Sequence, residues 1–144
     1  MGSENIKDIV LNFNKKLNEL LNVLICLAKT EKDRTGFDRI KKRIQLAKQL
    51  VDEKIVISTA GQYMNTYKDQ IMRRDTEFIF SVDVNAECKR LNVTVESDDE
   101  NKYILDLFDS MRTACKNISA EEKNILANMV FDMYREYLKF VVMS

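Results

Sequence analysis

The stretch that decides the fold is "SAEEKNILANMVFDMYREYLKFVV", residues 119–142. It opens with Ser119 and carries Glu122 three positions later, the spacing of a capping box, in which each of the two side chains bonds the other residue's backbone N–H. An apolar row at steps of three and four follows at once, which places its members on one face of a helix. The pattern therefore predicts a long amphipathic helix. Its row consists of Leu126, Met129, Val130, Met133, Tyr137, Phe140 and Val141.

The same stretch carries a second apolar row, made of Phe131, Tyr134, Leu138 and Val142. A helix that is apolar on two sides is either central to its own domain or covered by another chain. Both readings remain open at this stage. We expect these four residues to form a protein–protein interface, either with a partner or with a second copy of the chain.

The first part of the chain predicts another long helix, with Ser3 available as its N-cap and an end near Gly36. Its apolar row steps by four and three over three heptads. The members of this row are Ile6, Val10, Phe13, Leu17, Leu20, Leu24 and Leu27.

Two further helical rows follow Gly36 and Gly61, and both glycines are read as helix ends. Between the two rows, "IVIS" at 55–58 is rich in β-branched residues and could form a short extended segment. The first row holds Phe37, Ile40, Ile44, Ala47 and Val51, and the second holds Tyr63, Tyr67 and Ile71.

At Arg73, Arg74 and Asp75 one helix is predicted to end and another to begin, because cations suit a helix C-terminus and an aspartate suits an N-cap. The new helix is expected over Thr76 to Val82. A second capping box, Ser97 with Glu100, precedes a helical row of Ile104, Leu107, Met111, Ala114 and Ile118. The predicted fold is all-α: one domain over 1–144, a bundle of about five helices with room for one short extended segment.

Composition excludes several classes of function. Of the 144 residues none is His, so a Ser-His-Asp triad, a Cys-His pair and a histidine-ligated zinc site are impossible. Apolar residues make up 45% of the chain, yet no run approaches the ~18 residues that span a bilayer. The first residues lack the pattern of a signal peptide, which predicts an intracellular protein, not secreted. We expect no enzyme activity, no catalytic residue, no metal and no cofactor.

The basic run "RIKKRIQLAK" at 39–48 is the one candidate for a charged partner. Arg39, Lys42 and Arg43 could contact phosphates of a nucleic acid or an acidic protein, or could simply be the solvated face of a helix. The formal net charge of zero gives no global pull toward nucleic acid or membrane.

Cysteine and acidic residues are read structurally. Cys26, Cys88 and Cys115 form no CxxC pair and are expected to be buried free thiols. The acids Asp98, Asp99, Glu100, Asp106 and Asp109 lack the spacing of a calcium loop, so they are expected to favour a helix N-terminus.

Two stretches, "YKDQIMRRDTEFIFSVD" at 67–83 and "NISAEEKNILANMVFDMYREYLKFV" at 117–141, resemble short, uncharacterised all-helical proteins of large nucleocytoplasmic DNA viruses. The resemblance covers about a third of the chain and contains no catalytic motif. It implies a viral origin and a role either in virion structure, such as that of a minor capsid component, or in virus–host protein contacts. The location that it implies is the host cytoplasm or the virion. It rests on Tyr67, Ile71, Arg74, Asp75, Phe78, Phe80, Ser119, Glu121 and Glu122.

Overall fold

The computed structural model describes residues 5–50, 54–79, 110–115 and 118–143. In these ranges the protein is helical and holds no strand, which confirms the predicted all-α class. Residues 110–114 are helical as well. Six helices have their bounds in the described part, more than the five predicted: α1 (Ile6–Leu27), α2 (Glu31–Leu50), α3 (Lys54–Thr66), α4 (Lys68–Met72), α5 (Thr76–Ile79) and α8 (Ala120–Met143).

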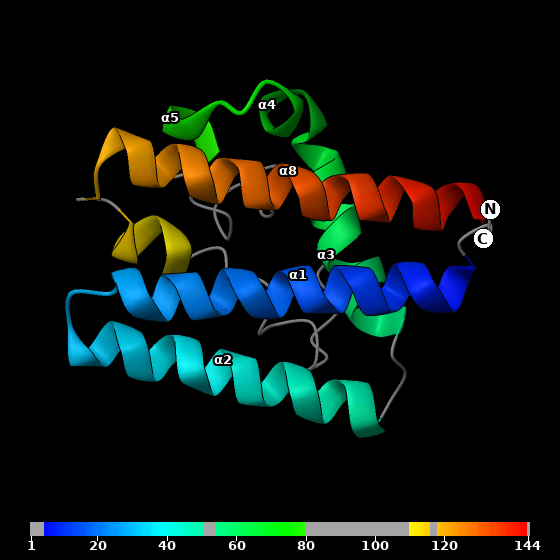
Figure 1. The fold of residues 1–144 in the computed structure, drawn as a ribbon, viewed down its shortest axis with the longest axis horizontal. Helices are drawn as coiled ribbons and strands as arrows, with labels where there is room; N and C mark the ends of the chain where they lie inside the picture. Colours follow the sequence, from blue (N-terminus) through cyan, green and yellow to red (C-terminus); the bar gives the residue numbers. More distant parts are fainter. Residues whose placement is uncertain (1–4, 51–53, 80–109, 116–117, 144) are drawn as a thin grey trace.

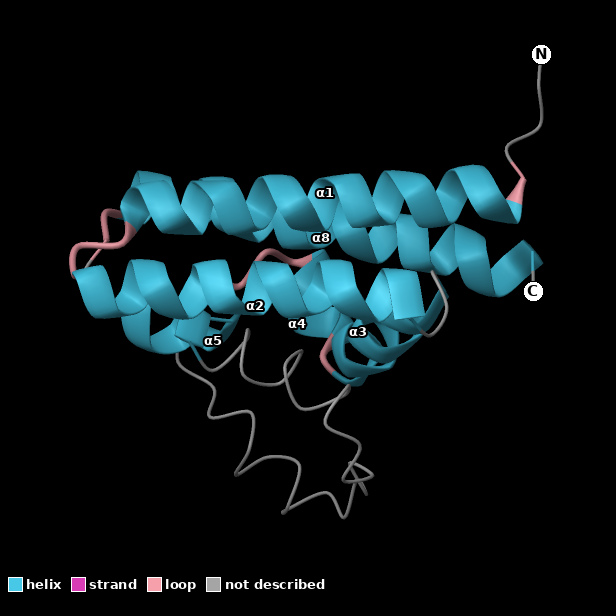
Figure 2. Ribbon diagram, turned by 90° about the horizontal axis from the view of Figure 1, so that it is seen from below, coloured by secondary structure: helices cyan, strands magenta, loops and turns pink. Residues whose placement is uncertain are grey.

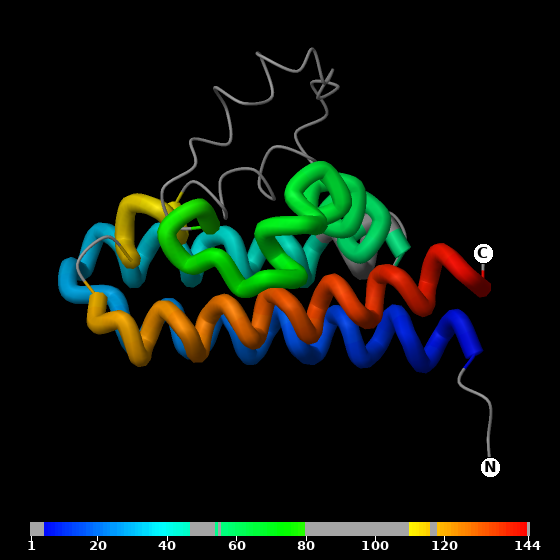
Figure 3. The backbone as a smooth tube through the Cα atoms, turned by 90° about the horizontal axis from the view of Figure 1, so that it is seen from above, coloured from blue at the N-terminus to red at the C-terminus, as the bar shows by residue number. Residues whose placement is uncertain are grey.

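Three long helices set the shape of the molecule. α8, α1 and α2 lie side by side with α1 in the middle, and α1 runs antiparallel to both neighbours (Figure 1). The start of α1 and the end of α8 therefore lie at the same end of the molecule. The pairing of α1 with α8 is the most extensive of the helix contacts and runs along both helices (Figure 3). The shorter helices cover this pair from one side, α3 against α1, α2 and α8, and α4 and α5 against α8 (Figure 2).

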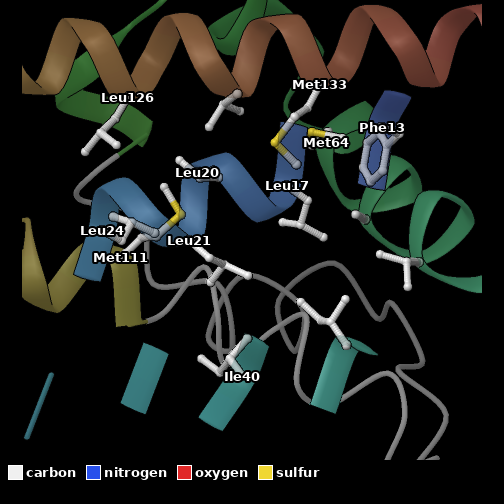
Figure 4. Packing of buried hydrophobic residues seen from close by; sticks show 14 of the residues in the cluster. Phe13, Leu17, Leu20, Leu21, Leu24, Ile40, Met64, Met111, Leu126 and Met133 are labelled. Carbon is white, nitrogen blue, oxygen red and sulfur yellow. The ribbon is translucent and has the colours of Figure 1, made fainter. Parts of the chain in front are cut away.

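The core is built around α1, whose buried face is wider than the predicted row. Ile9 and Leu21 are buried as well, at 0% and 1% exposure. Side chains of this face meet Leu126 and Met133 of α8 and Met64 of α3 (Figure 4). Burying each such side chain contributes about 1.5–3 kcal/mol, so α1 holds the bundle together from its centre.

The capping box at Ser119 is confirmed. The Glu122 N–H donates to Ser119 Oγ at 3.1 Å, and the Ser119 N–H donates to Glu122 Oε1 at 3.0 Å. The start of the first helix is corrected: Asn5, not Ser3, is the N-cap, since its Oδ1 accepts from the Asp8 N–H at 2.9 Å.

Gly36 does not end a helix, and the prediction of a break there was wrong. The first helix ends at Leu27, and α2 already begins at Glu31. Thr30 supplies the cap, because its Oγ1 accepts from the Asp33 N–H at 3.1 Å. Gly36 lies in the second turn of α2, next to Phe37, which is fully buried in the core.

The expected extended segment at 55–58 and the helix end at Gly61 are also corrected, because both lie inside α3. Val56 and Ile57 are fully buried, so packing overrides the weak preference of β-branched residues for strands. Gly61 is needed for a different reason. A Cβ atom at this position would overlap the ring of Tyr137, so a glycine lets α3 approach α8 closely.

The junction at Arg74 and Asp75 is confirmed as the end of one helix and the start of the next. The Asp75 N–H donates to the Gln70 carbonyl at 2.9 Å and the Arg74 N–H to the Ile71 carbonyl at 3.0 Å, the two bonds of a Schellman motif. Asp75 Oδ1 then accepts from the Phe78 N–H at 3.1 Å and caps α5. Helix α5 is described as far as Ile79.

Several predicted features lie outside the described residues: the capping box of Ser97 and Glu100, the row positions Val51, Ile104 and Leu107, and the end of the predicted helix at Val82. Of the row before Ile118, Met111 and Ile118 itself are buried in the core.

Candidate protein-interaction surface

Two of the four residues expected at a partner interface are covered by the chain itself. Tyr134 is 2% exposed, and its hydroxyl donates to Asn65 Oδ1 of α3 at 2.9 Å. Burial raises the pKa of the Tyr134 phenol, so it stays a neutral donor. Phe131 is half-buried beneath Arg74, whose guanidinium carbon lies 3.9 Å from the ring centre. These contacts tie α3 and the α4–α5 junction to α8.

The other two residues lie open at the end of α8. Leu138 is 39% exposed and Val142 is 84% exposed. Val141, which was placed in the core row from the sequence, joins them with an exposure of 48%. Residues three and four positions apart are neighbours on a helix surface. We refer to Leu138, Val141 and Val142 as the C-terminal apolar patch.

The patch is presented on a rigid support and edged by cations. The preceding turns of α8 carry Met133 and Tyr134 into the core, which fixes the direction of the helix end. Arg135 and Lys139 are exposed next to the patch, and Lys139 Nζ pairs with Glu136 Oε1 at 3.4 Å. An apolar centre with a charged edge is the usual anatomy of a protein–protein interface.

The cation–π contact of Arg74 with Phe131 was missed at the level of sequence. Arg74 is the one described non-glycine residue with a left-handed backbone, at φ 52°. Arg135 approaches the same ring from α8, with its guanidinium carbon 5.9 Å from the ring centre. The "RRD" motif indicates the helix junction, but nothing local indicates that α8 passes beneath it.

The basic run lies on the outer face of α2. Arg39, Lys42 and Arg43 are all exposed, while Ile40 and Ile44 beside them are buried in the core. Lys42 pairs with Asp38 at 3.0 Å one turn earlier, with both side chains at least half exposed. Such exposed pairs contribute about 0–1 kcal/mol, so Lys42 can exchange this partner for another anion at little cost.

The cysteines differ from each other. Cys115 is buried, as predicted, and burial raises its pKa to about 11, which keeps the thiol protonated and inert. Cys26 is exposed, so the expectation that it is buried was wrong: its position on α1 points away from the row that faces α8 and α2. Cys88 lies outside the described residues.

Within the described ranges, no three side chains of metal-binding type come together. The acids at 98, 99, 100, 106 and 109 are not among these ranges. None of the described helices combines the length and the apolar character that a bilayer crossing requires.

Comparison of the chain with known protein families, with curated proteins and with solved structures found no match. The class that the fold and the surface define is thus an all-α protein with an exposed apolar patch at the end of its last helix.

Proposed function

We propose that this chain is a non-enzymatic helical interaction protein that binds another protein, or a second copy of itself, through the end of α8. The observation that carries the proposal is the exposure of three apolar neighbours, Leu138, Val141 and Val142, on a helix whose earlier turns are fixed in the core. Covering them would remove apolar area from water, at about 25 cal/mol for each Å².

A direct test changes Leu138→Asp and Val142→Asp together. Sedimentation of the purified chain over a range of concentrations measures self-association, and the native mass in an extract of the source cells measures assembly with other proteins. We expect the double variant to lose the assembly. The control is Leu46→Asp on α2, which introduces one of the two negative charges at a leucine with 56% exposure and should leave the assembly intact.

The proposal is contradicted if the wild-type chain has a monomer's mass both when purified and in the extract. It is also contradicted if the double variant assembles as well as the wild type. Both substituted positions of the double variant are exposed, so we expect its helices to be retained. Circular dichroism of each variant checks this.

The resemblance to helical proteins of large DNA viruses extends the proposal to a small structural component of a virion. Support for this step comes from the resemblance alone, at 67–80 and 119–122. Mass spectrometry of purified particles tests it, because a structural component remains after the particles have been washed and protease-treated.

The alternative function is an accessory factor that contacts nucleic-acid phosphates through Arg39, Lys42 and Arg43. The observation in its favour is that Arg39 and Arg43, one turn apart and exposed, have no ion pair with any described residue. A salt titration separates the two functions. Phosphate contacts give an affinity that falls steeply with salt concentration, whereas an apolar interface responds little.

A further inference from the structure

A hollow of about 290 Å³ lies between α1 and α2, on a different side of α1 from α8. Its apolar wall is made by Leu17 and Leu21 of α1 and Ile44 of α2. Its polar lining includes Asn14, Lys15 and Lys41. The volume is at the small end of the range for ligand sites, ~300–1,000 Å³, and therefore suits a small molecule.

Asn14 is the unusual member of this lining. The residue is only 6% exposed, and neither its Oδ1 nor its Nδ2 has a hydrogen-bond partner among the described residues. Buried polar groups are nearly always bonded, so an amide left with both its donor and its acceptor unused needs an explanation. The terminal torsion of an asparagine is broad, and the amide can turn toward a group bound in the hollow.

The charges around the hollow are of one sign. Lys15 and Lys41 line it, and no Asp or Glu is among those of its lining residues that the structure describes. Lys41 Nζ gives one hydrogen bond to Asn22 Oδ1 at 2.8 Å, which leaves two of its three donors for an anion. The lining thus offers an apolar wall, an amide with a free donor and acceptor, and two cations.

We propose that this hollow binds a small carboxylate that carries both an apolar body and an amide, the chemistry of an N-acylated apolar amino acid. The apolar side chain packs on Leu17, Leu21 and Ile44. The ligand's amide is trans, so its C=O and N–H point in opposite directions and Asn14 bonds one of the two: either Nδ2 donates to the C=O, or Oδ1 accepts from the N–H. The carboxylate accepts from Lys15 or Lys41.

The test uses the full chain and N-acetyl-leucine as the probe. Binding is followed by NMR, through the side-chain amide signals of Asn14 and the methyl signals of Leu17, Leu21 and Ile44. We expect these signals to shift together and to saturate with a dissociation constant in the millimolar range. If none of them shifts up to the solubility limit of the probe, the proposal is wrong.

Two related probes separate the contribution of the ligand's amide from that of its carboxylate. Isocaproate keeps the branched chain and the carboxylate but lacks the amide, and N-acetyl-leucinamide keeps the amide but lacks the carboxylate. Each should bind about 3- to 10-fold more weakly, the effect of losing one or two hydrogen bonds. Equal affinity for all three would overturn the proposal, and so would a longer peptide ending in leucine that binds far more tightly, since this would assign the hollow to a protein terminus.

Variants of the lining residues test whether the probe binds in this hollow. Asn14→Leu should bind N-acetyl-leucine as weakly as the wild type binds isocaproate. Lys15→Met and Lys41→Met together should weaken binding of the two carboxylates but not of N-acetyl-leucinamide, with Lys42→Met, which lies outside the hollow, as the control. If Asn14→Leu disturbs the fold, Asn18→Phe at the exposed edge of the hollow blocks it instead. Unchanged binding by these variants would show that the probe binds elsewhere.

Discussion

Two glycines of this chain lie inside helices and differ in what surrounds them. A methyl group at Gly61 would overlap the ring of Tyr137, whereas nothing lies within 4 Å of a methyl group at Gly36. We expect Gly61→Ala to lower the free energy of unfolding by about 1–3 kcal/mol through overpacking. Gly36→Ala should raise it by about 0.5–1 kcal/mol, because alanine is the better residue inside a helix. Urea unfolding of both variants measures the contrast.

Asn14 gives the second prediction for a single residue. Replacing it with Leu removes a buried amide that has no partner among the described residues, so we expect a gain of about 1–3 kcal/mol in the free energy of unfolding. Asn18→Leu, one turn later and exposed, is the control and should change stability by no more than about 0.5 kcal/mol. A loss of stability in Asn14→Leu would mean that the amide is satisfied in solution.

At the scale of a helix, the start of α8 depends on the Ser119–Glu122 capping box. Ser119→Ala should lower the free energy of unfolding by about 0.5–2 kcal/mol, measured by urea unfolding. The other bond of the capping box, from the Ser119 backbone N–H to Glu122, depends on pH with a defined sign. The Ser119 N–H holds the pKa of Glu122 below its ordinary value of 4.5. The stabilisation by Glu122 is therefore complete above that pH and is lost as the pH falls through the lower pKa of the folded state.

The junction between α4 and α5 can be tested by a double-mutant cycle. Arg74→Gly relieves the left-handed backbone, a gain of about 1–2 kcal/mol, but removes the contact with Phe131, a loss of about 0.5–1 kcal/mol at an exposed site. The gain in stability should therefore be larger in a Phe131→Leu background than in the wild type. If Arg74→Gly has the same effect in both, the cation–π contact contributes nothing.

At the scale of the whole molecule, the two described thiols report on different states. Cys26 is exposed and should react with a thiol reagent at the rate of a free cysteine. Cys115 is buried among core residues and should react only when the protein opens, at a rate that follows the free energy of unfolding. Both rates are measured in a Cys88→Ser background, with Cys26→Ser and Cys115→Ser to assign them. A fast reaction at Cys115 would contradict its burial.

The burial of Cys115 should also make the free energy of unfolding depend on pH in the alkaline range. Burial raises the pKa of its thiol from 9.0 to about 11. A group with a raised pKa contributes its full stability below pH 9 and loses it as the pH rises toward 11. The free energy of unfolding should decline over this window, and less steeply in Cys115→Ala, as followed by urea unfolding at each pH.

The candidate surface could be predicted only in part. The helical spacing of the sequence predicted the second apolar row, Phe131, Tyr134, Leu138 and Val142. Spacing alone does not indicate which of these side chains are buried by other parts of the same chain. Tyr134 is buried because Asn65, 69 residues earlier, reaches it, and Phe131 is covered by Arg74. The hollow at Asn14 carries no motif at all, since its wall comes from two helices. That 1–144 forms one domain stays a prediction.

The sequence by itself determined the features that depend on neighbours along the chain. Helical periodicity predicted α1 and α8. The N-cap residues Asp75 and Ser119, whose side chains accept from the N–H three residues later, indicated the starts of α5 and α8. Only the tertiary structure decided that 55–58 is helical, that Gly61 admits Tyr137, and that Cys26 faces outward. These features depend on contacts between residues far apart in the chain, whose free energy exceeds the local preferences of a fraction of a kcal/mol that a sequence displays.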